Sequence, residues 1–449
     1  MPSHWATAPR LVNPRSRQGG QAPPCSQLLK KITPMSDSSS LAASATDAVK
    51  NRRNSLLAAV FLMATSAIGP GFITQTATFT ATMGAAFAFG ILASILIDFV
   101  VQLNIWRVVT LSRMRASDVA NAALPGSGYV LAVLVIFGGL VFNIGNIAGA
   151  GLGLNALMGL DVKWGGALSA AIAIGIFLSR RAGVAIDRLI IVLGLLMIGL
   201  TLFVAFASNP PLGEALRQTV WPDTINFATI TTIVGGTVGG YITYAGAHRL
   251  LDKGLTGTEN LGAVTKGALN GIAVTGLMRY ILFLAVLGVV ASGAAIDISG
   301  KTANPAAQAF QIAAGEFGLR AFGLILWAAA ITSVIGAAYT SISFITVFNQ
   351  KLTETGRNRA TVIFIAVSLA VFLALGTAPA ALLVFAGGFN GLILPLGLTI
   401  FVYVGWARPD LMEGHRTPTW LLVLGALTCA LTWYMGYKSI GPIFAFLGL

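Results

Sequence analysis

Two glycine-rich interruptions lie inside otherwise apolar segments of the chain. A Gly-Pro-Gly sequence at residues 69–71 breaks the first long apolar segment, and Gly-Gly pairs at 235–236 and 239–240 break the sixth. Proline has no amide hydrogen and glycine favours irregular backbone, so both breaks free backbone N–H and C=O groups. Amides freed at the start of a half-helix attract negative charge. The breaks therefore predict a binding site for a small polar or anionic solute.

Polar side chains accompany both breaks and a third apolar segment. Gln75 follows the first break by about one helical turn, and Thr237 and Tyr241 belong to the second. Their amide and hydroxyl groups are suitable partners for a polar solute, although threonines in such helices also bond their own backbone. We take as candidate substrate-binding residues Gly69, Pro70, Gly71, Phe72, Gln75, Asn143, Asn146, Gly236, Thr237, Gly239, Gly240 and Tyr241.

Two ionisable residues lie well inside apolar segments, Asp98 in the second and Arg279 in the seventh. A charge at that depth of a membrane is costly and is by default functional. Arg279 is suited to hold an anionic substrate while Asp98 carries a coupling proton. The alternatives are a static structural ion pair between them, or span ends misplaced by a turn so that one of the two charges reaches the membrane interface.

The elements that must position these residues are membrane-spanning helices. Of the 449 residues, 56% are hydrophobic and only 10% are charged, a composition typical of a polytopic membrane protein. Windows of about 20 apolar residues predict about eleven spans. These lie near residues 56–82, 85–111, 128–157, 165–180, 184–208, 225–249, 268–293, 319–347, 360–376, 380–405 and 418–437. Paired broken spans in two halves of such a chain indicate a transporter.

Lys and Arg gather in alternate loops, before span one and after spans two, four, six, eight and ten. The positive-inside rule makes these loops cytoplasmic, which places the N-terminus inside and the C-terminus outside, in the inner membrane if the protein is bacterial. The formal net charge of +13 follows largely from this bias and the basic tail. We therefore expect lipid and a small solute or ion as partners, and no nucleic acid.

Residues 1–50 differ from the transmembrane domain predicted over 51–449. They are rich in Ser, Pro, Ala and Gln, and we expect a disordered cytoplasmic tail without a cleavable signal peptide. Met35 is an alternative start. The two cysteines, Cys25 and Cys429, provide neither a disulfide framework nor a metal cluster, so no metal site and no cofactor are predicted.

The arrangement of motifs resembles the NRAMP family of proton-coupled divalent-metal transporters. The likeness extends over nearly all of residues 55–437 and rests on the broken first and sixth spans, a third span ending in GAGLGLN at 149–155, and a Ser/Thr-rich eighth span. The resemblance implies a LeuT-type fold with inverted repeats of five spans each, about 55–208 and 225–405, and an extra helix at about 418–437. It also implies that spans one and six unwind at mid-membrane and that access to the site alternates.

The family's metal ligands are absent at the matching positions. Its first-span Asp-Pro-Gly-Asn falls on residues 69–72, where Gly and Phe replace Asp and Asn, and its sixth-span Met falls on Gly239. Its third-span Asp and Glu, linked to the proton route, fall on Asn143 and Asn146. Mg2+ and Mn2+ prefer oxygen ligands that usually include a carboxylate, so the sequence argues against the family's usual cargo.

We therefore expect a secondary-active symporter with a remodelled, roomier site for a carboxylate or bicarbonate-like solute, coupled to H+ or Na+. The glycines have an alternative interpretation as close helix-packing surfaces. The alternative function is transport of Mg2+ or Mn2+ through backbone carbonyls and retained water. No motif of an enzyme rises above chance. His248 has two interpretations, a solvated helix end or part of an exit path at the inner side. The sequence predicts no oligomeric state.

Overall fold

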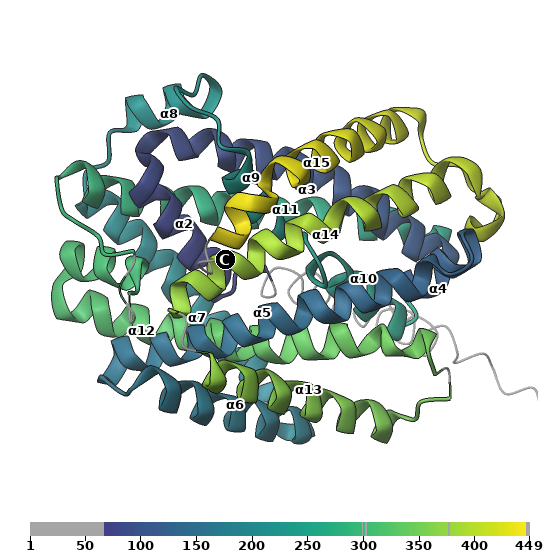
Figure 1. The fold of residues 1–449 in the computed structure, drawn as a ribbon, viewed down its shortest axis with the longest axis horizontal. Coiled ribbons are helices and arrows are strands. Elements are labelled where there is room, and N and C mark those ends of the chain that lie inside the picture. Colours follow the sequence, from purple (N-terminus) through teal and green to yellow (C-terminus); the bar gives the residue numbers. More distant parts are fainter. Residues whose placement is uncertain (1–66, 299, 301–302, 350, 376–377, 446–449) are drawn as a thin grey trace, which may run out of the picture. The chain divides into compact units, whose positions relative to one another are not determined.

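The computed structural model describes residues 67–298, 300, 303–349, 351–375 and 378–445, all within one compact unit, Arg52–Leu449. Every regular element among them is a helix (Figure 1). The first six are α2 (Pro70–Met83), η2 (Gly84–Ala86), α3 (Phe87–Ser112), α4 (Ala116–Ala123), α5 (Ser127–Met158) and α6 (Val162–Leu178). The predicted tail, the alternative start at Met35 and the first part of span one lie outside the described residues.

The second half of the chain continues the helical order. It comprises α7 (Arg180–Ala207), α8 (Leu212–Val220), α9 (Phe227–Gly235), α10 (Ile242–Asp252), α11 (Thr258–Ala291), α12 (Pro305–Ser343), η3 (Ile345–Val347), α13 (Glu354–Ala374), α14 (Pro379–Ala407), η4 (Pro409–Met412) and α15 (Thr419–Ala445). Each predicted span corresponds to a helix or, for span six, to the pair α9 and α10. The prediction of an all-α polytopic membrane protein is confirmed.

Within the described residues, seven helical segments are long and apolar enough to cross a membrane by themselves. This number is below the predicted eleven for identifiable reasons. The helix α6 has only 17 residues, α2 continues into α3 as one segment of 43 residues, and span six is divided. The end of α7 forms a further candidate with α8, to which it is bent by 110°.

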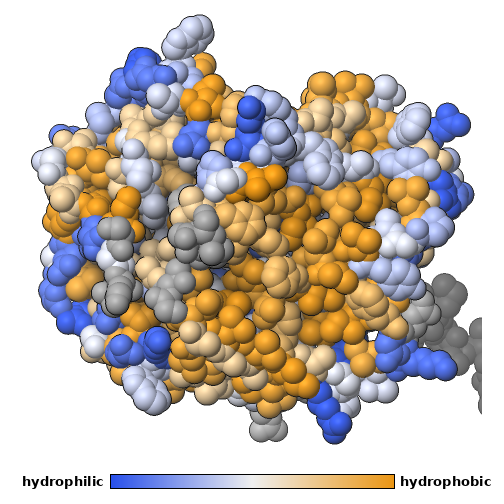
Figure 2. Space-filling model, in the orientation of Figure 1, coloured by the Kyte–Doolittle hydropathy of each residue, from blue (hydrophilic) through white to orange (hydrophobic). Residues whose placement is uncertain are grey.

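Polar loop contacts fall into two groups that correspond to the two predicted sides. On the predicted inner side, ion pairs of 2.6 Å join Arg113 to Glu413 and Arg115 to Asp252. On the other side, Arg320 donates to the Leu157 carbonyl at 2.8 Å. On the face shown in Figure 2, apolar residues form a broad band and hydrophilic residues gather at two opposite edges. The pattern fits a bilayer crossed by the helices between these edges.

Helix α5 packs closely against α12 and α6, which lie beside it (Figure 1). A Cβ added at Gly153 would lie 2.6 Å from the backbone nitrogen of Trp327 in α12, and one at Gly151 would collide with the Val162 carbonyl. Only glycine lets these backbones approach so closely. The GAGLGLN sequence is therefore a helix-packing surface that holds α5, and with it Asn143 and Asn146, in place.

The variant Gly153→Ala is expected to lower the unfolding temperature in detergent by several degrees, because an overpacked core costs ~1–3 kcal/mol. The matched control is Gly175→Ala on α6, where an added Cβ meets nothing within 4 Å. The measurement is thermal unfolding followed by intrinsic tryptophan fluorescence. Equal unfolding temperatures for the two variants would contradict the packing role of Gly153.

Candidate functional site

The first break places an uncapped helix start in the middle of the protein. Helix α2 begins at Pro70 with Gly69 as its N-cap, and no side chain caps the exposed amides. Proline suits this position because its missing N–H would be unpaired there in any case. A Cβ at Gly69 would lie 2.6 Å from Ser333 Oγ and 3.8 Å from Asn146 Oδ1. The break therefore faces α12 and α5, and the absence of a side chain at Gly69 allows this approach.

The second break separates α9 from α10 by six residues, 236–241. Gly240 has a φ of 53°, in the left-handed region that favours glycine. The amides of Gly239, Gly240 and Tyr241 donate to no acceptor in the described part of the chain. Successive free amides at the start of a helix form a concave group that attracts anions. The break provides donors for a negative group, and none of its own residues, 236–241, carries a carboxylate or thioether that would ligate a metal cation.

The expectation of a roomier cavity at the second break is wrong for this structure. Cβ atoms at Gly236 and Gly240 would collide with the side chains of Gln75 and Asn390, and one at Gly239 would lie 2.6 Å from the Gly235 carbonyl oxygen. The space that side chains would fill is taken by close approach of α9, α14 and α2. Of the two interpretations of these glycines, close packing is the one that the geometry supports.

Gln75 connects the two breaks to α14. Its Nε2 donates to the Leu383 carbonyl at 3.0 Å, while its Oε1 has no hydrogen-bond partner although it is buried. Cβ atoms at Gly236 and Gly387 would both collide with its amide, one from each side. The side chain is thus held between two glycines of different helices. Leu383 and Gly387 were not among the sequence candidates, and the Gly-Gly pair at 387–388 is the only sequence signal that points to them.

The two asparagines of α5 have different surroundings. Asn143 donates from Nδ2 to Ser368 Oγ at 3.1 Å and leaves Oδ1 unpaired, whereas Asn146 has an unpaired Nδ2. The Tyr241 hydroxyl comes near the Asn146 side chain, but the two lack hydrogen-bond geometry. Buried polar atoms without partners are rare in proteins. Asn146 and Tyr241 thus leave two donors available between the first break and the second.

The threonine of the second break does not offer its hydroxyl proton to a solute. Thr237 donates from Oγ1 to the Ile233 carbonyl at 2.7 Å, and on α2 Thr76 donates to Phe72 in the same way. For these two residues the alternative interpretation, bonding to the helix's own backbone, describes the structure.

Arg279 lies between the two broken spans. Its side chain is 2% exposed, its guanidinium carbon lies 4.2 Å from the centre of the Phe72 ring, and Nη1 donates to the Ile233 carbonyl at 3.1 Å. Phe72 belongs to the first turn of α2 and Ile233 to the last turns of α9, so one arginine contacts both half-helices. Its Nε and Nη2 have no hydrogen-bond partner within the part of the chain that the structure describes.

Asp98 on α3 is the charged neighbour of Arg279, as the helices α3 and α11 pack together. It is 1% exposed, and its Oδ1 has no hydrogen-bond partner. The two groups interact electrostatically without forming a direct ion pair. The alternative of a static, directly bonded salt bridge is therefore not what the structure contains. Asp98 and Arg279 thus both have buried hydrogen-bonding atoms without partners among the described residues, and leaving such atoms unpaired lowers the stability of the folded protein.

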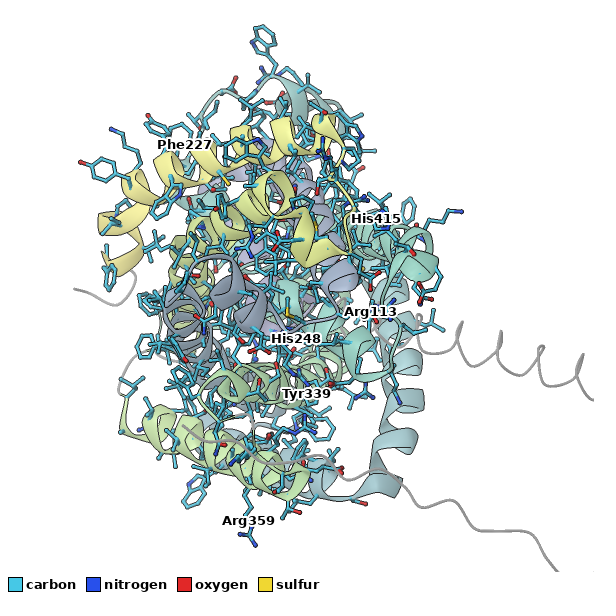
Figure 3. The ribbon with its side chains drawn as sticks, turned by 90° about the vertical axis from the view of Figure 1, so that its right-hand side faces the viewer. Arg113, Phe227, His248, Tyr339, Arg359 and His415 are labelled. Atoms are coloured by element: carbon cyan, nitrogen blue, oxygen red, sulfur yellow. The ribbon has the colours of Figure 1, made fainter. Side chains whose placement is uncertain are left out.

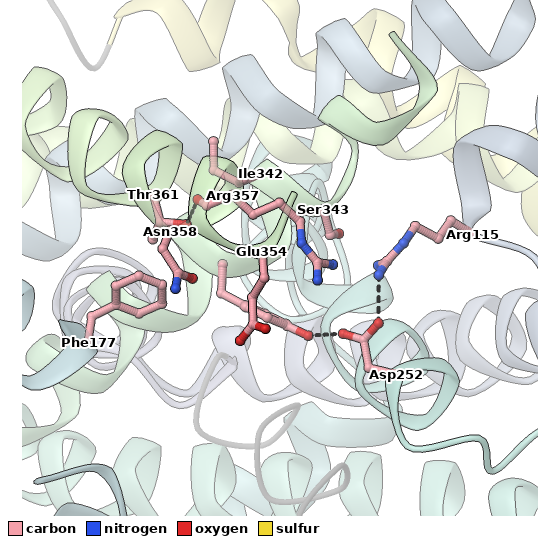
Figure 4. Close-up of a pocket in the computed structure, with 10 residues that line it drawn as sticks. Arg115, Phe177, Asp252, Ile342, Ser343, Glu354, Arg357, Asn358 and Thr361 are labelled. Carbon is pink, nitrogen blue, oxygen red and sulfur yellow. Dashed lines mark hydrogen bonds and ion pairs between the residues drawn. The ribbon is translucent and has the colours of Figure 1, made fainter. Parts of the chain in front are cut away.

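A cavity of about 260 Å³ at the predicted inner side is lined by residues of α10, α12 and α13, together with Phe177 of α6 and Arg115, the N-cap of α4 (Figure 4). Arg115 and Arg357 face it with Asp252 and Glu354. Asp252 also accepts a hydrogen bond from the Tyr339 hydroxyl. The charges that face the cavity are balanced, so it is not a site of one sign.

His248 contacts Ser343, which lines this cavity, and is completely buried, so its interpretation as a solvated helix end is wrong. The Ala116 amide donates to its Nε2 at 3.1 Å, which leaves the ring proton on Nδ1, 2.7 Å from Ser343 Oγ. Figure 3 shows His248 and Tyr339 inside the bundle, with Arg359 pointing away from it. The ring fastens α10 to α4 and α12.

Comparison with known proteins identifies the family. The sequence matches the description "Natural resistance-associated macrophage protein-like" (Nramp) over residues 60–440. It is 50% identical over 385 residues to the membrane protein YcsG of Bacillus subtilis. This alignment covers 86% of this chain and 94% of YcsG. It is 47% identical over 392 residues to a membrane protein of Haemophilus influenzae, covering 87% and 97% respectively.

Solved structures agree with the fold. A manganese transporter of Eremococcus coleocola superposes with a TM-score of 0.68 at 15% identity and covers 86% of both chains. MhsT, in complex with L-phenylalanine, superposes with a TM-score of 0.57 at 16% identity and covers 87% of this chain and 98% of that one. The order of helices, the helix start at Pro70, the division of span six and these likenesses agree: the chain belongs to the Nramp family and is a membrane transporter with a LeuT-type fold.

Proposed function

We propose that this protein is a secondary-active transporter that carries a small anionic solute, a carboxylate or bicarbonate-like ion, in symport with H+ or Na+. One observation carries the proposal: the buried Arg279 guanidinium contacts both half-helices and keeps two nitrogens without a partner. Arginine presents its N–H groups in a planar fork that matches a carboxylate. An anion between the breaks would complete the hydrogen bonding of Arg279.

The free amides of residues 239–241 and the unpaired donors of Asn146 and Tyr241 support the same sign of charge. They belong to the same two breaks that Arg279 contacts. MhsT, which shares the fold, is described in complex with an amino acid, a solute that carries a carboxylate. These donors make a carboxylate the solute that the site fits best.

Transport of Mg2+ or Mn2+ is the second candidate, favoured by the likeness to a manganese transporter. The side chains available as metal ligands argue against transport of these cations. No cluster of three or more His, Cys, Asp or Glu suited to a metal ion occurs among the described residues. The position that matches the family's methionine, Gly239, faces backbone at 2.6 Å and has no room for a ligand. A dication would have to bind through backbone carbonyls, water and the unpaired amide oxygens of residues such as Gln75 and Asn390, without a carboxylate or a thioether.

The topology is part of the proposal. Since Arg113, Arg115 and Arg408 lie at one end of the bundle with Asp252 and Glu413, we assign that end to the cytoplasm. The N-terminus is then inside and the C-terminus outside, and the membrane is the inner membrane if the protein is bacterial.

The test is uptake into proteoliposomes that contain the purified protein, with radiolabelled acetate, lactate, succinate and bicarbonate in one series and Mn2+ and Mg2+ in another. We expect saturable, counterflow-capable uptake of one or more anions and none of the metals. A metal-transporting relative serves as the positive control for the metals. Saturable Mn2+ or Mg2+ uptake without anion uptake would overturn the proposal in favour of the second candidate.

A further inference from the structure

We propose that Asp98 is the proton-carrying group of this transporter, and that Asp98 and the substrate anion alternate as the counter-charge of Arg279. One proton then crosses the membrane with each monovalent anion, and the pair moves no net charge. This inference rests on the proposed function, because it requires an anionic substrate next to Arg279.

Asp98 and Arg279 are charged neighbours that do not form a direct salt bridge. Asp98 and Arg279 project from neighbouring helices, α3 and α11, and each is the other's only charged neighbour among the described residues. No direct ion pair joins them, and Asp98 Oδ1, Arg279 Nε and Arg279 Nη2 lack hydrogen-bond partners among the described residues. A pair of this kind can exchange one partner for another without first breaking a tight salt bridge.

Charge balance in an apolar site dictates the coupling. With the site empty, the arginine cation and the aspartate anion sum to zero. A monovalent anion that enters beside Arg279 would leave one uncompensated negative charge, which is expensive in a buried place. Binding of a proton to the Asp98 carboxylate restores neutrality. When the anion leaves on the other side, the proton leaves too, and the aspartate again balances Arg279.

Among the side chains that the structure describes, no second titratable group is placed to take over this role. In the described part of the chain, α2 and α9, which pack against α3 or α11, carry no titratable side chain. The remaining described ionisable groups on α3, on α11, on elements packed against them and at the caps of these elements lie near the ends of the bundle, are held by other partners or are tyrosines: Arg107, Arg113, Arg115, Asp118, Glu214, Arg217, Tyr241, Tyr244, His248, Arg249, Asp252, Lys253, Glu259, Lys266, Tyr280, Glu316, Arg320, Tyr339, Tyr403, Arg408, Asp410, Glu413, Cys429, Tyr434, Tyr437 and Lys438. Only Arg279 acts electrostatically on Asp98.

Arg279 also connects this exchange to the two breaks. Its contacts with Phe72 and with the Ile233 carbonyl lie directly after the first break and before the second. An anion that draws the guanidinium toward itself alters the contacts of both half-helices at once. Proton and anion binding would thus bias the same elements whose movement opens and closes the site.

The experiment uses the purified full-length protein and the four anions of the uptake series. Titration calorimetry in two buffers of different ionisation enthalpy gives the number of protons taken up per bound anion. For the wild type we expect about one proton per monovalent anion near neutral pH. For Asp98→Asn, which imitates the protonated aspartate, we expect retained binding with no proton uptake. Glu316→Gln, which alters an exposed carboxylate near the outer end, serves as the control and should behave as wild type.

Transport gives a second readout that a purely structural aspartate would not alter. Asp98→Asn should keep anion exchange across the membrane and lose accumulation driven by a pH gradient. Should Asp98→Asn fail to fold, the double variant Asp98→Asn/Arg279→Gln leaves no unpaired buried charge; it should fold and show neither anion nor proton binding.

The outcomes separate the two proposals. Anion binding without proton uptake, or proton uptake that persists in Asp98→Asn, overturns the coupling inference and leaves the proposed function standing. Absence of binding and uptake for all four anions, in protein that carries Mn2+ or Mg2+, overturns both.

Discussion

Replacement of Arg279 by glutamine is expected to reduce anion uptake roughly a hundredfold. The variant removes a charge-assisted interaction worth about 3 kcal/mol at a buried site, and each ~1.4 kcal/mol corresponds to tenfold in affinity. It also removes the donor to the Ile233 carbonyl and the cation above the Phe72 ring. The loss should appear as a raised half-saturation concentration in proteoliposome uptake, because the interaction holds the bound anion.

Anion uptake by Arg279→Lys should lie between that of the wild type and that of Arg279→Gln, about tenfold below the wild type. Lysine keeps the positive charge but lacks the planar fork of N–H donors. The matched control is Arg320→Gln, which removes an exposed arginine at the outer end and should leave uptake unchanged. Thermal unfolding of each variant separates loss of binding from loss of fold. Unchanged uptake in a well-folded Arg279→Gln protein would contradict the placement of the anion beside this residue.

Much of the fold can be predicted from the sequence because the bilayer constrains it strongly. A spanning segment must satisfy its backbone internally, so long apolar runs are helices, and the first and sixth runs show their interruptions as Pro70 and as the glycines around Gly239. Helix boundaries were less predictable. Helix α11 begins at Thr258, ten residues before the predicted start at 268, because a polar first turn with Glu259 carries no hydropathy signal.

The candidate site was predicted less completely, for a physical reason. A glycine in a sequence does not show whether it leaves an open space or allows another part of the protein to pack against it. At Gly236 and Gly239 other atoms occupy the space. The closing partner of Gln75, the Leu383 carbonyl, comes from a residue 308 positions away. Likewise, the sequence identified Asp98 and Arg279 as buried charges, but only their three-dimensional placement shows that they approach each other without closing into an ion pair.

The close packing around Gln75 allows a test of whether this side chain sets the spacing between α2 and the break at Gly236. Gly236→Ala is expected to abolish most transport, because its Cβ would collide with the Gln75 amide and break the 3.0 Å hydrogen bond to Leu383. The three atoms nearest to that Cβ all belong to Gln75. Truncation of Gln75 should therefore relieve the collision. We expect the double variant Gly236→Ala/Gln75→Ala to be more stable than Gly236→Ala alone, with a coupling energy of about 1–3 kcal/mol.

Gly387→Ala provides the matched contrast, since its Cβ would meet both the Gln75 amide and the Thr232 carbonyl oxygen, the latter at 2.7 Å. A backbone atom cannot be removed by mutation of Gln75, so Gln75→Ala should not restore Gly387→Ala. The measurement is a double-mutant cycle on thermal unfolding, with uptake recorded in parallel. Rescue of both glycine variants would mean that Gln75 alone sets the spacing of these helices, and rescue of neither would mean that the break at Gly236 is closed by the backbone rather than by the Gln75 side chain.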